Sequence, residues 1–111
     1  MDVTILLGSS SDLPIAQKCT KILEHFDVPY QLRVASAHRS PKFVEQIVGD
    51  AIDDGCSVFI AMAGLAAALP GAVAALTTKP VIGVPCGGRV PYDSLLSCLL
   101  YTSDAADDCE G

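Results

Sequence analysis

The chain has 111 residues, of which 50% are hydrophobic and 18% are charged, and its net charge is −6. This length fits one domain, and the acidic balance argues against the basic surface with which proteins bind nucleic acids. No apolar run reaches the ~18–20 residues of a membrane-spanning helix, and the start, MDVTILLGSSSD, lacks the basic region of a signal peptide. We therefore expect a cytoplasmic protein that works neither on nucleic acid nor in a membrane.

The five cysteines are odd in number and form no CxxC pair. Reduced, mostly buried thiols are the simplest interpretation. We expect no metal site, because His25 and His38 stand at no ligand spacing to any cysteine.

The first half of the chain alternates apolar runs with amphipathic segments. Residues 3–7 (VTILL) predict a buried strand that stops at Gly8. A helix should follow, with Pro14 near its first turn and apolar residues at helical spacing up to Phe26. Residues 31–35 then predict a second strand.

The second half repeats the pattern. Ser40-Pro41 should open a helix that ends near Asp54-Gly55, followed by a strand over residues 57–61. A third helix is expected around residues 71–76, and a fourth strand over residues 80–84. This alternation predicts an α/β fold, a flavodoxin-like three-layer sandwich with a parallel sheet.

The distinctive loops all follow strands. They cover residues 8–12, 36–39, 63–68 and 83–88. Ligands of such sheets bind outside the carboxyl ends of the strands, so we expect the four loops to form one pocket.

The loop GSSSD (residues 8–12) places serine hydroxyls and backbone amides where a helix begins. This arrangement suits an anion, but simple helix capping explains it equally well. It is neither a P-loop nor a GxGxxG fingerprint, which disfavours nucleoside triphosphates and dinucleotides. Asp12 would repel a phosphate and fits the hydroxyls of a ribose better.

The loop SAHRS (residues 36–40) places an imidazole beside a guanidinium. His38 can give and take a proton near neutral pH, and Arg39 can hold a phosphate or carboxylate. The alternative is an ordinary surface histidine, and the position at a strand's end favours function. The small-residue stretch 61–76 fits close approach to a flat ligand, or equally tight packing against a neighbouring element.

Taken together, GSSSD, SAHRSP, AGLAAALPG and KPVIGVP resemble the 5-(carboxyamino)imidazole ribonucleotide mutase family, over about residues 2–97. These enzymes of purine biosynthesis are related to the aminoimidazole ribonucleotide carboxylases. The resemblance implies an isomerase that moves a carboxylate from the exocyclic nitrogen to ring carbon 4, giving 4-carboxy-5-aminoimidazole ribonucleotide. It also implies a homo-octamer for the full-length family member, a small ribonucleotide substrate, and no metal or organic cofactor.

The resemblance further implies a role for each matching residue. His38 would be the catalytic acid and base, Ser9 and Arg39 would hold phosphate with support from Ser11, and Asp12 would contact the ribose. The remaining substrate-binding positions are Ser36, Ala63, Gly64 and Ala68.

Two departures from the family loop stand out, because Leu65 replaces a common glycine and Ala68 replaces a common histidine. Proton handling would then rest on His38 or on water. A carboxylase that uses carbon dioxide directly remains an alternative, although Arg39 and Leu69–Gly71 favour the mutase. A non-catalytic nucleotide-binding module of the same fold is a second alternative. A signalling receiver domain is excluded, because it needs a phosphorylatable aspartate after the third strand and the loop after Ala61 contains no acidic residue.

The family resemblance stops after residue 97. Asp93–Leu96 predict the start of a fourth helix, but residues 98–111 read CLLYTSDAADDCEG and look like translated adapter sequence. A divergent acidic tail is the alternative. We therefore expect residues 1–97 to be a partial domain that lacks the last strand and the C-terminal helices of its family.

Overall fold

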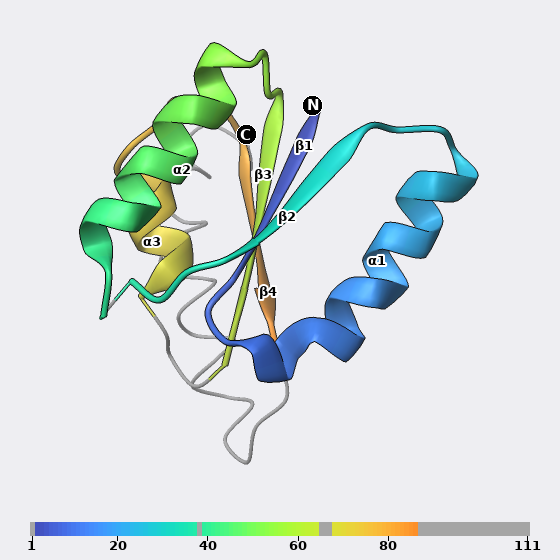
Figure 1. Cartoon of the computed structure of the whole chain (residues 1–111), viewed down its shortest axis with the longest axis horizontal. Helices are drawn as coiled ribbons and strands as arrows, with labels where there is room; N and C mark the ends of the chain where they lie inside the picture. Colours follow the sequence, from blue (N-terminus) through green and yellow to red (C-terminus); the bar gives the residue numbers. More distant parts are fainter. Residues whose placement is uncertain (1, 38, 65–67, 87–111) are drawn as a thin grey trace, which may run out of the picture.

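Four parallel strands form the centre of the computed structural model, which describes residues 2–37, 39–64 and 68–86. They are β1 (Val3–Leu7), β2 (Tyr30–Val34), β3 (Val58–Ala63) and β4 (Val81–Pro85). The order in the sheet is β2-β1-β3-β4, which matches the first four strands of a flavodoxin-like sheet (Figure 1). The predicted fold class is therefore confirmed.

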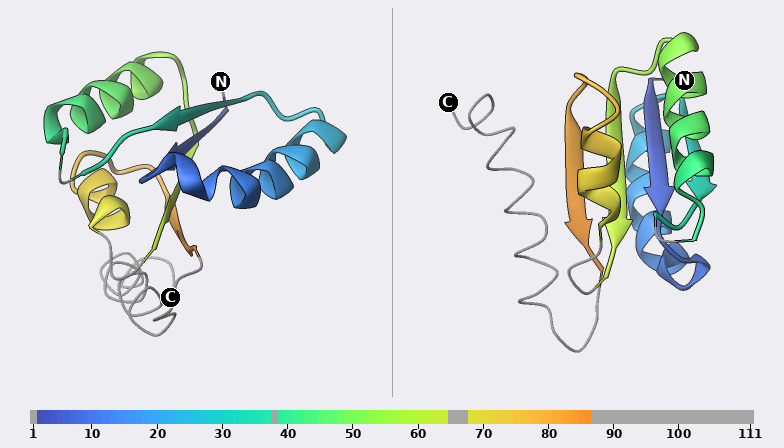
Figure 2. Two further views of the ribbon diagram at one scale, coloured as in Figure 1. Left: turned by 60° about the horizontal axis from the view of Figure 1, so that its bottom comes forward. Right: turned by 90° about the vertical axis from the view of Figure 1, so that its left-hand side faces the viewer.

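The α-helices of the described residues cover both faces of this sheet. Helix α1 (Leu13–His25) lies on one face, and α2 (Pro41–Asp53) and α3 (Leu69–Ala74) lie on the other (Figure 1 and Figure 2). The chain moves from β1 outward to β2 and then back past β1 to β3. Because each crossover is right-handed, this reversal places α1 and α2 on opposite faces.

The face under α2 and α3 is tightly closed. Helix α2 buries one stripe against the sheet, where Phe59 and Leu6 are fully buried; the stripe consists of Val44, Ile47, Val48 and Ala51. The stripe repeats every three or four residues, as a helix facing a core requires. This face carries the larger share of the fully buried side chains.

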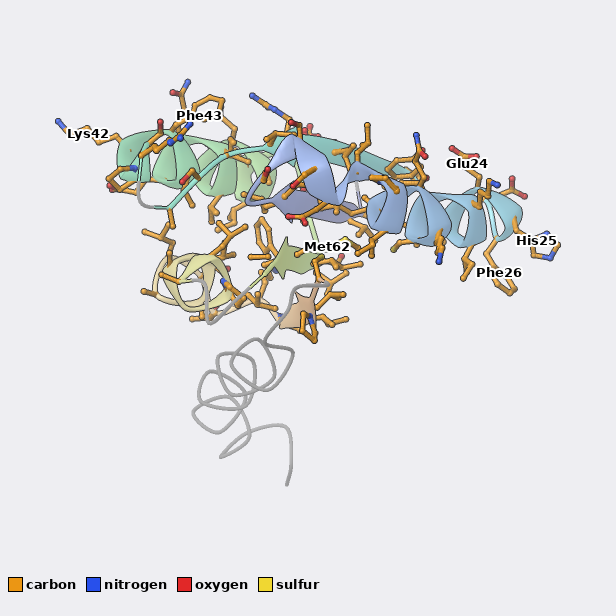
Figure 3. The ribbon with its side chains drawn as sticks, turned by 90° about the horizontal axis from the view of Figure 1, so that it is seen from below. Glu24, His25, Phe26, Lys42, Phe43 and Met62 are labelled. Carbon is orange, nitrogen blue, oxygen red and sulfur yellow. The ribbon has the colours of Figure 1, made fainter. Side chains whose placement is uncertain are left out.

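The face under α1 is closed less completely. Ile5 and Leu7 of β1 are fully buried there, but Ala16 is the one buried residue of α1. Ile22 is 60% exposed and Phe26, just past the end of the helix, is 68% exposed (Figure 3). The apolar stripe expected for α1 is therefore only partly used in the described structure.

Most element boundaries lie within one residue of the sequence-based expectation, whereas the end of β3 and both ends of α3 lie two residues away. Strand β3 continues to Ala63 instead of ending at Ala61, because Met62 and Ala63 pair with Val84 and Pro85 of β4. Helix α3 begins at Leu69, before the expected Gly71, and Pro70 occupies its first turn. Both shifts shorten the loop between β3 and α3 at the carboxyl edge of the sheet.

Some expectations fall outside the described residues. These are the fourth helix from Asp93, the loop positions 87–91 and the whole of the acidic tail. In the three described ranges, no helix is both long and apolar enough to cross a membrane.

Candidate functional site

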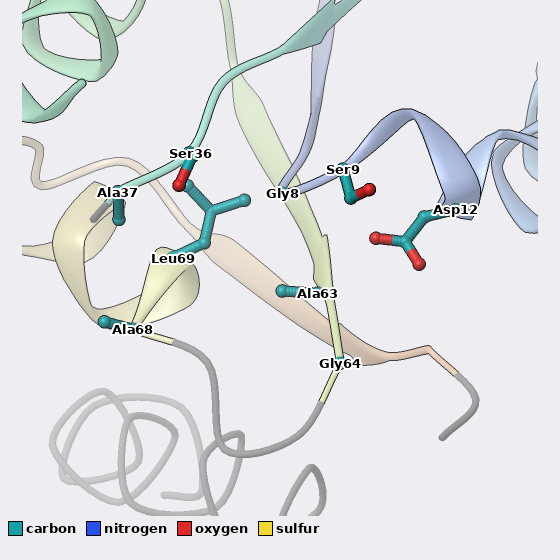
Figure 4. Close-up of a pocket in the computed structure, with 9 residues that line it drawn as sticks. All are labelled: Gly8, Ser9, Asp12, Ser36, Ala37, Ala63, Gly64, Ala68 and Leu69. Atoms are coloured by element: carbon teal, nitrogen blue, oxygen red, sulfur yellow. The ribbon is translucent and has the colours of Figure 1, made fainter. Parts of the chain in front are cut away.

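The loops after β1, β2 and β3 meet at the carboxyl edge of the sheet and enclose two adjoining clefts, one of which is drawn in Figure 4. Gly8, Ser9 and Ser36 line both clefts and are their shared boundary, which we call the ridge. Of the fourth expected loop, the described residues 83–86 line neither cleft. Among the described residues, three of the four predicted loops contribute to the candidate site.

The Asp12 cleft lies between the ends of β1 and β3 and has a volume of about 170 Å³. Beyond the shared ridge, its lining consists of Asp12, Ala37, Ala63, Gly64, Ala68 and Leu69. Among the described residues of this lining, Asp12 is the one charged group, and the wall contributed by β3 and α3 is apolar. The described cleft thus offers one acidic group and an apolar wall.

The Arg39 cleft lies between the ends of β1 and β2 and has a volume of about 450 Å³. Beyond the ridge, it is lined by Ser10, Val34, Ala35, Arg39, Ser40 and Phe43. Serine hydroxyls and one guanidinium supply its polar side-chain groups, and the lining residues that the structure describes include no carboxylate. Hydrogen-bond donors with a positive charge favour an anion in this cleft.

Gly8 allows the two strands beneath the site to approach closely. Its N–H donates to the Met62 carbonyl at 2.9 Å, which extends the pairing of β1 and β3 by one residue. A Cβ atom at this position would lie 3.3 Å from the Cβ atom of Ala63, closer than an ordinary van der Waals contact. Glycine at this position therefore allows β1 and β3 to approach closely beside both clefts.

The GSSSD loop is a 3₁₀ turn, η1 (Ser10–Asp12), that precedes α1. Ser9 Oγ accepts the Ser11 N–H at 3.2 Å and lies 2.9 Å from Ser11 Oγ. Asp12 occupies the N-cap position of α1 without a side-chain capping bond. Ser9 therefore caps a helical turn, as the helix-capping interpretation of the sequence predicted, and it also lines both clefts.

Burial raises the pKa of the Asp12 carboxyl above its ordinary value of 3.8, and a hydrogen bond with the Ser9 backbone partly opposes this effect. The partly buried carboxylate is thus held by the same turn that positions Ser9. An acceptor fixed at the mouth of an apolar cleft is suited to the hydroxyls of a sugar.

The SAHRS loop is organised by a second serine. Ser36 Oγ accepts the Arg39 N–H at 3.2 Å, which folds the loop back before α2 begins at Pro41. The exposed guanidinium of Arg39 makes no hydrogen bond or ion pair with the other described residues, so it remains available to a ligand. His38, the expected acid and base, lies outside the described residues, as do positions 65–67.

The remaining expected residues separate into two groups. Ser9, Asp12, Ser36, Ala63, Gly64 and Ala68 line the Asp12 cleft, and Arg39 lines the other cleft with Ser9 and Ser36. Ser11 lines neither cleft. In the part of the chain that the structure describes, no three His, Cys, Asp or Glu side chains are grouped as metal ligands.

Sequence reasoning missed Ser40 and Phe43 as cleft residues. Ser40 was interpreted as a helix cap, but it makes no side-chain capping bond. Phe43 (labelled in Figure 3) is apolar, yet it is 39% exposed. The centroid of its ring lies 5.6 Å from the Arg33 guanidinium carbon. Its position one residue before the buried stripe that starts at Val44 is the signal that it faces sideways.

Comparison with known proteins agrees with this geometry. A family model described as AIR carboxylase matches residues 2–106. The N5-carboxyaminoimidazole ribonucleotide mutase of Methanocaldococcus jannaschii is 55% identical over 96 residues, which is 86% of this chain and 59% of that protein. The phosphoribosylaminoimidazole carboxylase of Candida glabrata is 48% identical over 86 residues, 78% of this chain and 15% of that protein.

A solved structure shows the same architecture. The crystal structure of Treponema denticola PurE superposes with a TM-score of 0.77 at 31% identity, covering 87% of this chain and 63% of that chain. This chain thus spans less than two thirds of the length of each of these proteins. With a sheet of this order, two clefts at its carboxyl edge and a family model matched over nearly its whole length, the chain belongs to the AIR carboxylase family.

Proposed function

We propose that the site belongs to an isomerase of purine biosynthesis that converts 5-(carboxyamino)imidazole ribonucleotide into 4-carboxy-5-aminoimidazole ribonucleotide. The observation that carries this proposal is the pair of adjoining clefts, one suited to an anion and one acidic at one end and apolar along its wall. A ribonucleotide monophosphate has matching parts: a phosphate, a ribose and a flat heterocycle. The similarity to several proteins named as mutases supports the choice of reaction.

The substrate would bind across the ridge. Arg39 and Ser9 donate to the phosphate, and the Asp12 carboxylate accepts from ribose hydroxyls. The imidazole ring then lies in the Asp12 cleft against Ala63 and Ala68. Each part of the ligand meets a group of complementary polarity.

The reaction needs one proton to be delivered and one to be removed. When the C–N bond to the carboxylate breaks, its electron pair stays on the exocyclic nitrogen, which takes a proton from His38. Ring carbon 4 then attacks the freed carbon dioxide, and His38 takes the proton that this carbon loses. One imidazole acts as acid and then as base, and regains its original state.

The apolar wall of the Asp12 cleft would keep carbon dioxide beside the ring during this exchange. Ala37, Ala63, Ala68 and Leu69 provide no hydrogen-bonding side chain. A small apolar molecule is retained better by such a wall than by a hydrated one.

The central test is the His38→Asn variant of the chain. Turnover of the carboxyamino substrate should be lost, whereas binding of the product should stay within about threefold of the unaltered protein, since other residues hold the ligand. Unchanged turnover in this variant would refute the role of His38 and would favour a non-catalytic nucleotide-binding module.

A direct carboxylase is the second candidate, favoured by the similarity to the Candida glabrata carboxylase. Supplying each substrate separately, with bicarbonate controlled, distinguishes the two reactions. A mutase converts the carboxyamino compound without added bicarbonate, and a carboxylase requires carbon dioxide and the unmodified ribonucleotide.

We also propose that the family-length form works in the cytoplasm as a homo-octamer without a metal or organic cofactor. The resemblance to the mutase family supports this assembly. Light scattering on a family-length version would give eight times the protomer mass, and chelators would leave its turnover unchanged.

A further inference from the structure

We propose that Ser11 is a positioning residue that acts through Ser9 and does not touch the ligand. The inference rests on the proposed function in one respect, namely that an anionic group lies against Ser9. It assigns to Ser11 the task of directing the Ser9 hydroxyl hydrogen into the clefts.

The positions of the two serines differ although their hydroxyls are adjacent. Ser9 lines both clefts, whereas Ser11 lines neither. Ser11 nevertheless makes two contacts with Ser9 Oγ: its N–H donates at 3.2 Å, and its own Oγ lies at 2.9 Å. Ser11 is thus placed behind the residue that faces the ligand.

The hydrogen-bonding capacity of Ser9 decides how this pair is arranged. A hydroxyl has one hydrogen and two lone pairs, and the Ser11 N–H already occupies one lone pair. If Ser9 donated its hydrogen to Ser11 Oγ, it would have none left for a phosphate, which offers only acceptors when fully ionised. Ligand binding therefore selects the opposite direction, in which Ser11 Oγ donates to Ser9.

In that arrangement both lone pairs of Ser9 are used by Ser11. The remaining hydrogen of Ser9 then has a single free direction, away from Ser11 and toward the clefts. The backbone of Ser9 is also held, because its carbonyl oxygen accepts the Asp12 N–H at 3.1 Å. Once the ligand selects this arrangement, the turn leaves the Ser9 hydroxyl one direction in which to donate.

A double-mutant cycle separates this role from a direct contact. If Ser11 acts through Ser9, its removal matters only while Ser9 is present. If Ser11 touches the ligand itself, the two losses add.

The experiment measures the affinity of the full chain for ribose 5-phosphate and for 4-carboxy-5-aminoimidazole ribonucleotide by isothermal titration calorimetry. Ser9→Ala should weaken binding by about tenfold or more, because a charge-assisted hydrogen bond is lost. Ser11→Ala should weaken it by about three- to tenfold, as expected for one neutral hydrogen bond. The double variant should bind no more weakly than Ser9→Ala, and Ser11→Thr, which keeps the hydroxyl, should bind like the unaltered chain.

Ser57→Ala serves as the matched control, because Ser57 is exposed and precedes β3 at the opposite edge of the sheet. Its affinity should equal that of the unaltered chain, and thermal unfolding should show that all variants fold. An equal loss from Ser11→Ala in both backgrounds would overturn the proposal, as would failure of the unaltered chain to bind either phosphate probe. Absence of turnover together with the expected coupling would instead count against the proposed reaction alone.

Discussion

The two faces of the sheet are covered by helices of similar length but very different burial. Helix α2 buries four residues of its stripe, whereas α1 buries Ala16 alone. On the α1 side, Ile22 and Ile82 remain 60% and 51% exposed. This difference indicates that the core under α2 and α3 stabilises the described fold most, whereas the sheet face under α1 is only partly covered.

The orientation of α1 explains which half is open. Glu24 accepts a hydrogen bond from Tyr30 of β2, so this flank of the helix faces β2. Ile22 and Phe26 lie on the other flank, toward β3 and β4, because successive residues advance by about 100° around a helix. The open strip therefore runs between α1 and the exposed face of β4.

The largest effect is expected for Ile47→Ala in α2. Ile47 is 1% exposed, so truncation leaves a cavity in the closed core. The free energy of unfolding should fall by about 2–5 kcal/mol, measured by urea denaturation of the full chain. A loss below about 0.5 kcal/mol would contradict the difference between the two faces, since it would mean that the core under α2 is not tightly packed.

Gly8→Ala tests the close approach of β1 and β3 at the residue that follows β1. The added Cβ would meet the Cβ atom of Ala63 at 3.3 Å, so β1 or β3 must shift. We expect a loss of about 1–3 kcal/mol in unfolding free energy and weaker binding of phosphate ligands, because Gly8 lines both clefts. An unchanged melting temperature and affinity would show that the floor of the site tolerates a methyl group.

Asp12→Asn tests the polar start of α1 through its pH dependence. Because burial raises the folded-state pKa of Asp12 above 3.8, folding favours its protonated form. The unaltered chain should therefore lose some stability relative to the variant as the pH rises from below 3.8 through the folded-state pKa. Denaturation curves at a series of pH values for both proteins give this difference, and a difference of opposite sign would contradict the assigned cause.

Ile22→Ala should have the smallest effect and is the matched partner of Ile47→Ala. The side chain is 60% exposed, and alanine favours helix formation. The unfolding free energy should change by at most about 0.5 kcal/mol. A loss comparable to that of Ile47→Ala would show that something covers this flank in solution.

Much of the fold was predictable because the hydrophobic pattern of each segment agrees with its burial in the folded structure. The run VTILL is buried along its whole length as β1, and the stripe of α2 appears as the spacing predicts. The end of β3 was misplaced because Met62 and Ala63 carry no strong strand signal of their own. Their place in the strand depends on pairing with β4, which is a tertiary contact.

The candidate site was predictable to a similar degree. Parallel strands bring their carboxyl ends together, so the GSSSD and SAHRS loops had to be neighbours. Their division into two clefts, and the contribution of Phe43, depend on how α2 starts relative to β2. No spacing in the sequence encodes that geometry, and the contact between the Ser9 and Ser11 hydroxyl oxygens is a result of the structure.

The boundary formed by Gly8, Ser9 and Ser36 also limits any ligand that fills both clefts. Such a molecule must pass these three residues, with an acidic group on the Arg39 side and an uncharged ring on the Asp12 side. Fragment soaking should accordingly yield two families of hits, small acids beside the guanidinium and uncharged ring systems beside the alanines. Joining one of each through a short flexible tether is the direct route to a compound that spans the whole site.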